Sequence, residues 1–149
     1  MPLQKPIYTT PQDTENAFYE AIRRADLDAF MNVWAEDEEI ICILPNGPRF
    51  SGYSNIREAW RRIFNSGRRF SMEVSNRLVM PSMLVTVHNV LETICMLDAP
   101  QEPGQGGGQS TPILATNIYI RSATGWRLQA HHASLTSSGN DTETTQTLH

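Results

Sequence analysis

The chain has 149 residues, of which 40 % are hydrophobic, and a formal net charge of −4. This length suits one domain, and the apolar content excludes a wholly disordered, collagen-like or coiled-coil chain. The acidic balance argues against nucleic-acid binding, because proteins of that class usually carry a basic stripe. The arginines between residues 57 and 69 are interrupted by Glu58, so we interpret them as a solvated helix face.

No membrane or export signal stands out in the sequence. No apolar run approaches the ~20 residues needed to span a bilayer, and residues 1–6 lack the apolar core of a signal peptide. We therefore expect a cytoplasmic protein without membrane contact. Cys42 and Cys95 lie in apolar runs, so in that reducing compartment we expect two core thiols and no disulfide.

Composition divides the chain into three parts. Residues 1–11 contain three prolines and predict an extended arm. Residues 12–136 predict the folded domain. Residues 137–149 are rich in small polar and acidic side chains and predict a disordered tail, because such a segment cannot bury enough apolar surface to offset its ordering entropy. Within the domain, the Gly-, Gln- and Pro-rich stretch from Asp98 to Pro112 predicts a long hairpin loop.

The spacing of apolar residues predicts three helices in the first half of the domain. The first follows an N-cap at residues 13–15 and continues to Ala25. The second begins after a cap at Asp26 and reaches Trp34. The third begins after a cap at Ser54 and stops near Gly67.

A short strand is predicted between the second and third helices, and four long strands after them. Their expected ranges are Ile40–Leu44, Phe70–Met80, Met83–Leu97, Ile113–Arg121 and Trp126–Leu135. Helices gathered first and hairpin-linked strands last predict an α+β fold with an antiparallel sheet. We expect a cone-shaped, curved sheet with the three N-terminal helices packed on its concave face and a ligand pocket at its mouth.

Two groups of residues resemble a known family. The segments Ala25-Asp26-Leu27-Asp28 and Trp34-Ala35-Glu36-Asp37 resemble the opening of the nuclear transport factor 2-like superfamily. The closing segments Ala115-Thr116-Asn117-Ile118-Tyr119, Gly125-Trp126-Arg127 and His131-His132-Ala133-Ser134 resemble its SnoaL-like branch, which is related to the association domain of calmodulin-dependent kinase II. The resemblance covers roughly residues 13–135 and implies the cone fold. It leaves function open, because this cone hosts isomerases, cyclases, dehydratases, binding proteins and oligomerisation domains.

The steroid isomerases of this superfamily offer a residue-by-residue comparison. They use a tyrosine on the first helix, an aspartate base on the first strand and an acidic oxyanion donor on a later strand. The corresponding positions hold Phe18, Cys42 and Asn117 here, and Tyr19 lies about 100° further round the helix than Phe18. We therefore expect no steroid isomerase activity, although Asn117 could still donate a hydrogen bond to a substrate oxygen.

Strand alternation assigns polar residues to the interior. On the last strand, one face is the more apolar and is placed inside; it carries Trp126, Leu128, Ala130, His132 and Ser134. His131 is then expected to point outward. On the preceding strand both faces are apolar, and the family resemblance selects the face of Asn117. With Glu92 chosen as inward, the expected site combines Glu92, Asn117 and His132, with His88 deeper or beside it.

These three residues suggest acid–base chemistry. Glu92 or His132 could abstract a proton, and Asn117 could stabilise the resulting oxyanion. In the alternative interpretation the same groups only satisfy one another, as buried polar side chains usually do. Because the cysteines and histidines lack a metal-site spacing, we expect neither a metal nor a cofactor.

Two functions therefore remain open. The chain is expected to be a SnoaL-like small-molecule-binding protein, with acid–base catalysis of the isomerase, cyclase or lyase type on a small, partly apolar carbonyl compound. The alternative is a non-catalytic ligand-binding or oligomerisation module resembling the kinase II association domain. The outward strand face of Leu114, Thr116, Ile118 and Ile120 is apolar, so we also expect a homodimer packed through the sheet.

Overall fold

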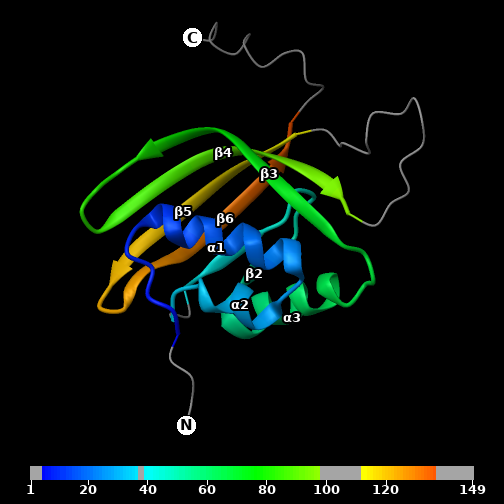
Figure 1. Ribbon diagram of the computed structural model, residues 1–149, viewed down its shortest axis with the longest axis horizontal. Helices are drawn as coiled ribbons and strands as arrows, with labels where there is room; N and C mark the ends of the chain where they lie inside the picture. The colour runs from blue at the N-terminus through cyan, green and yellow to red at the C-terminus, as the bar shows by residue number, and fades with distance from the viewer. Residues whose placement is uncertain (1–4, 37–38, 98–111, 137–149) are drawn as a thin grey trace, which may run out of the picture.

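A six-stranded sheet dominates the computed structural model, which describes residues 5–36, 39–97 and 112–136. The elements in chain order are α1 (Pro11–Arg24), α2 (Leu27–Asn32), β1 (Ile41–Ile43), β2 (Arg49–Ser51), α3 (Tyr53–Phe64), β3 (Phe70–Met80), β4 (Val85–Met96), β5 (Ile113–Ser122) and β6 (Gly125–Leu135). The strand order is β2-β1-β6-β5-β4-β3, and α1 crosses one face of the curved, unclosed sheet (Figure 1). The predicted α+β fold is confirmed.

Side-chain caps explain where the first two helices begin. The hydroxyl of Thr10 accepts a hydrogen bond from the backbone N–H of Asp13 at 3.0 Å, and Pro11 occupies the first helical turn. The N-cap predicted at residues 13–15 is therefore wrong, because the Thr10-Pro11 pair already starts the helix. At the next junction, the predicted cap is confirmed: Asp26 accepts from the N–H of Ala29 at 3.1 Å.

The four long strands lie close to their predicted ranges, whereas the sheet edge beside β1 differs from expectation. The sequence did not predict β2, because three residues are too few to show alternation. β1 pairs with β6 in parallel, while the other pairings in the sheet are antiparallel. The parallel pair places Cys42 beside His131 on the concave face.

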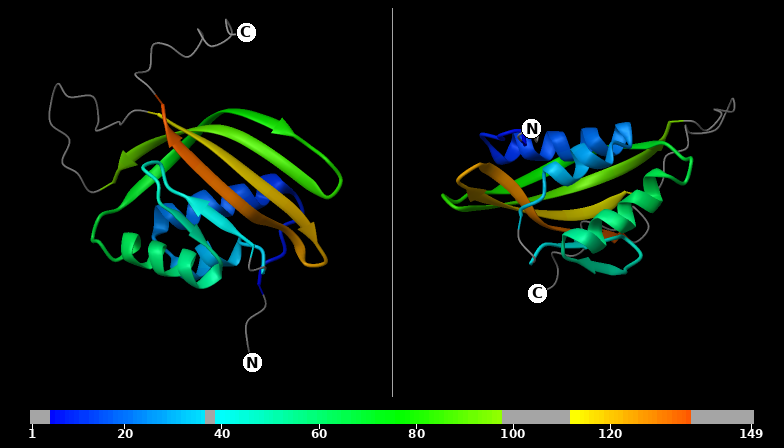
Figure 2. Two further views of the ribbon diagram at one scale, coloured as in Figure 1. Left: turned by 180° about the vertical axis from the view of Figure 1, so that it is seen from behind. Right: turned by 90° about the horizontal axis from the view of Figure 1, so that it is seen from below.

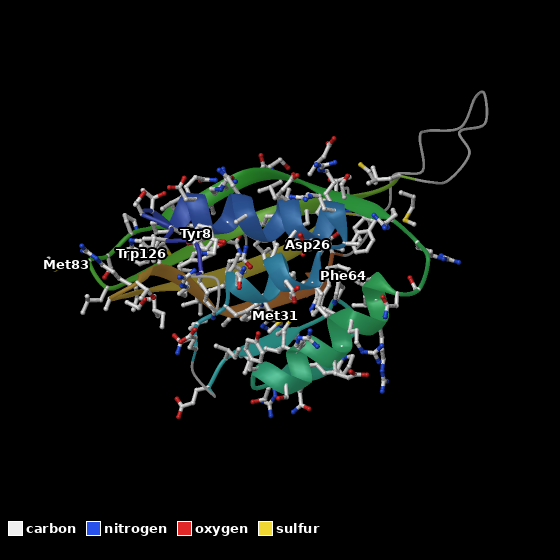
Figure 3. The ribbon with its side chains drawn as sticks, turned by 60° about the horizontal axis from the view of Figure 1, so that its bottom comes forward. Tyr8, Asp26, Met31, Phe64, Met83 and Trp126 are labelled. Carbon is white, nitrogen blue, oxygen red and sulfur yellow. The ribbon has the colours of Figure 1, made fainter. Side chains whose placement is uncertain are left out.

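An aromatic core fills the space between the helices and the concave face. The rings of Phe30 and Trp60 lie 4.5 Å apart and those of Phe18 and Phe30 5.2 Å apart, measured between centroids. The indole N–H of Trp60 also contacts the Sγ of Cys42 at 3.4 Å, which places α3 against β1. Figure 3 shows α2, which carries Met31, between α1 and α3. All three helices therefore contribute to one core on the concave side of the sheet.

The described residues of the N-terminal arm are attached to the start of β6. The backbone N–H of Trp126 donates to the carbonyl of Tyr8 at 2.9 Å, and Arg127 donates to the carbonyl of Pro6 at 2.7 Å. The guanidinium of Arg127 also lies 5.1 Å from the ring centroid of Tyr8. Residues 1–4 of the predicted arm, residues 98–111 of the predicted loop and the predicted tail at 137–149 lie outside the described residues.

The N-terminal arm packs against Gly125 so closely that this position requires a glycine. Its φ is +105°, and a Cβ at this position would lie 2.7 Å from the carbonyl oxygen of Tyr8. We expect Gly125→Ala to displace the arm and to lower the free energy of unfolding by about 2 kcal/mol more than Gly67→Ala does. Gly67 has a similar φ of +88° with nothing within 4 Å of the added Cβ, so it controls for backbone strain alone. Thermal unfolding of both variants measures the difference, and equal losses would contradict the docked arm.

Candidate functional site

A cluster of buried polar side chains lies between α1 and the concave face of the sheet. We call it the polar cluster; its members are Glu15, Tyr19, His88, Glu92, Asn117, Tyr119 and His131, each at most 8 % exposed. Glu15 and Tyr19 are four residues apart on α1 and share one helix face. The others come from inward positions of β4, β5 and β6. Polar groups buried to this degree need partners, and the hydrogen bonds of the cluster supply nearly all of them.

The carboxylate of Glu15 accepts hydrogen bonds from four side chains. Its Oε1 accepts from Nε of Arg77 at 2.7 Å. Its Oε2 lies 2.7 Å from the hydroxyl of Tyr119, 3.0 Å from Nδ1 of His88 and 3.1 Å from Nδ2 of Asn117. Burial raises the pKa of Glu15, but the bonds from His88, Tyr119 and Arg77 outweigh it and lower that pKa to about 2. Glu15 is therefore ionised at neutral pH.

A bulge in β3 brings Arg77 to this carboxylate. The pairing of β3 with β4 shifts register between Ser75 and Leu78, and Asn76 adopts a positive φ of 51°. The extra residue bends the strand and re-aims the next side chain, so Arg77 reaches across to Glu15 from the edge of the sheet.

Glu92 has a different electrostatic environment. The hydroxyl of Tyr19 donates to its Oε2 at 2.5 Å and itself accepts from Nδ2 of Asn117 at 3.0 Å. Among the described residues, the other oxygen of Glu92, Oε1, is buried and has no hydrogen-bond partner. Burial raises the pKa of Glu92, the bond from Tyr19 lowers it and the charge of Glu15 raises it, and together they bring it to about 7. Glu92 therefore gains and loses its proton near neutral pH.

His131 completes the cluster as a neutral side chain. Its Nδ1 lies 2.6 Å from Oδ1 of Asn117, and since that amide oxygen is an acceptor, Nδ1 carries the hydrogen. Its Nε2 is then unprotonated and lies 4.0 Å from Oε2 of Glu92. Burial, reinforced by neighbouring His132, lowers the pKa of His131 to about 4. His131 therefore holds the Asn117 amide with its N–H groups facing Glu15 and Tyr19.

The predicted position of His132 in the site is wrong. The structure exposes His132 and buries His131, the reverse of the expected orientations. Ile118 and Tyr119 are adjacent on β5, but they pair with Ala130 and Leu128 on β6. Gln129, between those two partners, is therefore an extra residue in β6. This bulge reverses the inward and outward alternation for the remainder of the strand.

The predicted inward orientations of Glu92 and Asn117 are confirmed. His88 also points inward, but its contact is Glu15 and not Glu92. Sequence reasoning missed Glu15 and set Tyr19 aside in favour of Phe18, whose ring instead packs 5.1 Å from that of His131. The available signal was the position of Glu15 on the same helical stripe as Phe18 and Tyr19, which turns its side chain toward the apolar face of the helix.

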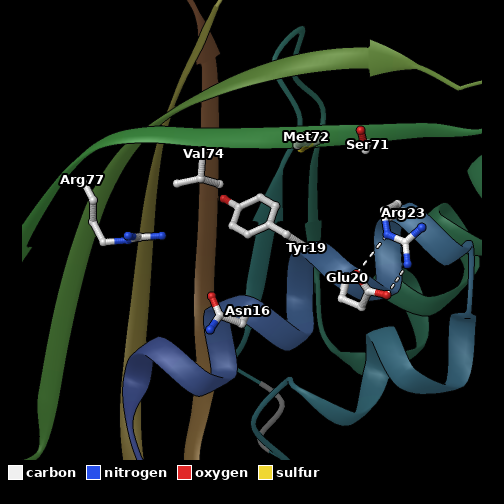
Figure 4. Close-up of a pocket in the computed structure, with 8 residues that line it drawn as sticks. All are labelled: Asn16, Tyr19, Glu20, Arg23, Ser71, Met72, Val74 and Arg77. Atoms are coloured by element: carbon white, nitrogen blue, oxygen red, sulfur yellow. Dashed lines mark hydrogen bonds and ion pairs between the residues drawn. The ribbon is translucent and has the colours of Figure 1, made fainter.

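A groove between α1 and β3 leads from solvent to the polar cluster. It has a volume of about 250 Å³, and its lining includes Tyr19 and Arg77, both in contact with cluster carboxylates. Figure 4 shows the Tyr19 ring extending from α1 toward β3 and Arg77 extending from β3 across the groove. Its lining also includes Met72 and Val74, which add apolar surface. A small ligand in the groove would therefore contact Tyr19, the residue whose hydroxyl donates to Glu92.

The described residues hold no metal-ligating cluster, and the Cys42 thiol is buried. No set of three or more His, Cys, Asp or Glu side chains there is arranged to hold a metal ion. Burial raises the pKa of the Cys42 thiol to about 12, so this thiol stays protonated. Of the described helices, none combines the length and apolar composition that crossing a membrane requires.

Comparisons with known proteins agree with this architecture. A family model described as a SnoaL-like domain matches residues 12–138. A protein from Thiobacillus denitrificans, proposed to be a calcium/calmodulin-dependent protein kinase type II association domain, is 30 % identical; the match covers 89 % of this chain and 99 % of that one, with a TM-score of 0.74. A proposed dehydratase of the nuclear transport factor 2-like family from Streptomyces avermitilis shares the fold at 23 % identity, with 84 % and 93 % coverage and a TM-score of 0.71.

A curated plant protein is also similar. F-box protein SKIP8 of Arabidopsis thaliana is 26 % identical over 121 residues, which cover 79 % of this chain. The chain spans 46 % of that protein's length, so the similarity concerns about half of it.

The raised pKa of Glu92 predicts a pH dependence of stability. The folded state keeps the proton of Glu92 up to about pH 7, whereas the unfolded state releases it near the ordinary value of 4.5. Glu92 therefore destabilises the fold increasingly as pH rises through this window, by roughly 3 kcal/mol at most. We expect the melting temperature of Glu92→Gln, relative to wild type, to rise between pH 5 and pH 8. Glu73→Gln, an exposed change on β3, is the control and should follow wild type. Parallel pH profiles for wild type and Glu92→Gln would contradict the assignment.

Proposed function

The chain belongs to the SnoaL-like domain family, and from that membership we propose that it binds a small, partly apolar carbonyl compound in the groove between α1 and β3 and exchanges a proton with it. The observation that carries this proposal is Glu92. A buried carboxyl group with a pKa of about 7 and one unpartnered oxygen matches what general acid–base catalysis needs near neutral pH.

Tyr19 connects Glu92 to the groove. Burial raises the pKa of Tyr19 well above its ordinary value, so the residue retains its proton. When Glu92 is ionised, the Tyr19 hydroxyl donates to it. When Glu92 is protonated, Glu92 becomes the donor, and the hydrogen of Tyr19 is free to point into the groove. The Tyr19 oxygen would then accept from Glu92 and Asn117 and donate to a ligand oxygen.

This arrangement defines a proton path. A carbonyl oxygen in the groove accepts the proton of Tyr19 as the proton of Glu92 moves onto the Tyr19 oxygen, which leaves Glu92 ionised. Water in the groove then takes the α-hydrogen of the protonated carbonyl, which gives the neutral enol and hydronium. In the reverse direction, hydronium returns a proton to the α-carbon, and the proton on the ligand oxygen passes back to Tyr19 as Tyr19 passes one to Glu92. Asn117 stabilises negative charge on the Tyr19 oxygen during the transfer. His131 is a positioning residue, because it orients the Asn117 amide.

The lining of the groove supports the substrate class. Met72 and Val74 offer apolar contact beside the polar and charged remainder of the lining, which includes Arg23 and Arg77, and this mixture suits a partly apolar compound with a polar oxygen. The volume of about 250 Å³ suits a ligand smaller than a typical drug. His132 has no part in this proposal, because it is exposed. Of the residues that the sequence proposed as catalytic, Glu92 keeps its acid–base role in this proposal, whereas Asn117 bonds the Tyr19 oxygen in place of a substrate oxygen.

A second candidate function is an oligomerisation module. On the face of β5 turned away from α1, Leu114 is 41 % exposed and Ile118 and Ile120 are half-buried. Viewed from behind, β4, β5 and β6 lie in front of α1 (Figure 2, left). The similar protein from Thiobacillus denitrificans is described as an association domain. We propose that two copies pack through this face about a two-fold axis, which is compatible with a ligand in the groove.

Hydrogen–deuterium exchange at the α-carbon of small ketones tests the catalytic proposal. We expect the wild-type protein to accelerate exchange in a panel of small cyclic and aryl ketones. Tyr19→Phe and Glu92→Gln should each lower the rate by about 100-fold or more, the usual contribution of a general acid–base group. His132→Gln is the matched control and should leave the rate unchanged. A wild-type protein without activity on the panel, or rates that both site variants leave intact, would overturn the proposal.

Light scattering tests the dimer. We expect a dimer at micromolar concentration and a folded monomer for Ile118→Lys, because a charge would then be buried at the interface. Leu84→Lys, an equally large change at an exposed site near the β3–β4 turn, should remain dimeric. A wild-type monomer would refute this assembly.

A further inference from the structure

A second pocket lies where the start of α1, the β3–β4 turn and the start of β6 meet. We call it the hairpin pocket; its volume is about 360 Å³, and its lining includes Pro11, Val79, Pro81, Thr86, His88 and Trp126. Figure 3 shows Trp126 at the end of the molecule that also carries Met83 of the β3–β4 turn. The pocket shares no lining residue with the groove between α1 and β3.

His88 is the buried polar group of the hairpin pocket. Its side chain is 3 % exposed, and its Nδ1 lies 3.0 Å from Oε2 of Glu15. Because Glu15 is ionised and can only accept, Nδ1 of His88 carries a hydrogen. The ring also meets the Tyr119 ring edge-on, with centroids 5.0 Å apart. Two contacts therefore fix the orientation of the imidazole.

The other ring nitrogen of His88 is the one free to bind a ligand. Within the described part of the chain, the hydrogen bond of the His88 ring is the one at Nδ1, so Nε2 has no partner there, while the ring lines the pocket. Nε2 of an imidazole that carries its hydrogen on Nδ1 accepts a hydrogen bond when the ring is neutral and donates one when the ring is charged. The charged groups nearby are Glu15 and, on the far side of that carboxylate, Arg77. A ligand hydroxyl therefore pairs with Nε2 in either form of the ring, because a hydroxyl both donates and accepts.

The walls of the pocket favour an aromatic ligand. Trp126, Val79, Pro81 and Pro11 present apolar surface, and the described lining includes no Asp, Glu, Lys or Arg. The hydroxyl of Thr86 is already directed to the carbonyl of Ser82 at 3.5 Å. A flat ring would pack against the indole of Trp126 and bring its polar substituent to His88. The uncharged polar residues Thr10, Gln12 and Ser82 complete the lining.

We propose that the hairpin pocket binds a small phenol, whose hydroxyl hydrogen-bonds to Nε2 of His88 and whose ring packs against Trp126 and Pro81. The pocket volume accommodates one or two fused rings. This site uses neither Glu92 nor Tyr19, so it does not rest on the proton transfer proposed above. Glu15 is a positioning residue here, because it holds the hydrogen on Nδ1.

Nitrogen-15 spectra of the histidine and tryptophan rings test the proposal. We expect titration with phenol or 2-naphthol to shift the Nε2 signal of His88 and the indole signal of Trp126 together, to saturation. Anisole, which has no hydroxyl hydrogen, should bind at least about tenfold more weakly than phenol. Tyr19→Phe and Glu92→Gln should bind the phenols as wild type does, which separates this site from the groove.

Two variants and one competing ligand complete the test. Val79→Asp places a charge in the pocket beside its cross-strand neighbour His88 and should weaken phenol binding about tenfold or more. Met80→Asp, on the next residue and outside the pocket lining, is the control and should retain binding. His88→Phe should abolish the preference for phenol over anisole, and if that variant does not fold, Val79→Asp decides. Equal affinity for phenol and anisole, unchanged binding by Val79→Asp, or tighter binding of benzoate than of phenol would each overturn the proposal.

Discussion

The buried carboxylate of Glu15 is the interaction on which the arrangement of the molecule depends. An ionised group at 0 % exposure is tolerated only if hydrogen bonds replace its lost water. Arg77 on β3, His88 on β4, and Asn117 and Tyr119 on β5 supply them. These bonds fix α1 at one position over the sheet, because a rotation of the helix would leave the charge without partners. Both pockets border α1, so their shapes follow from the same constraint.

Two carboxyl groups in one cluster behave in opposite ways. Glu15 is surrounded by donors and has a pKa of about 2, whereas Glu92 has one donor and an unpartnered oxygen and has a pKa of about 7. The permanent charge of Glu15 contributes to the raised pKa of Glu92. Asn117 touches Glu15 directly and Glu92 through Tyr19. The cluster thus combines a fixed anion with a proton carrier, a division of roles that acid–base sites commonly use.

Backbone irregularities decide which side chains enter the cluster. The bulge in β3 directs Arg77 to Glu15, and the extra residue Gln129 in β6 places His131 in the interior in place of His132. In regular strands, whose side chains alternate with a period of two, Arg77 would point away from Glu15, and His132 would point inward in place of His131. The site is therefore built as much by the departures from regular pairing as by the pairing itself.

The sequence by itself determined the α+β fold class and the long strands, because apolar periodicity is a local property of the chain. Periodicity did not determine the inward orientation of Asn117, because both faces of its strand are apolar and the family resemblance selected one; the inward face of Glu92 was a choice that the structure confirmed. Only the tertiary structure decided that His131, and not His132, points into the interior. A bulge arises from pairing with a neighbouring strand, and the alternation of apolar residues that precedes it in the sequence does not reveal it. It likewise decided that Glu15 is buried. Its donors Arg77 and Tyr119 lie 62 and 104 residues away along the chain, and a carboxylate on a helix is expected in solvent until such distant donors are known to converge on it.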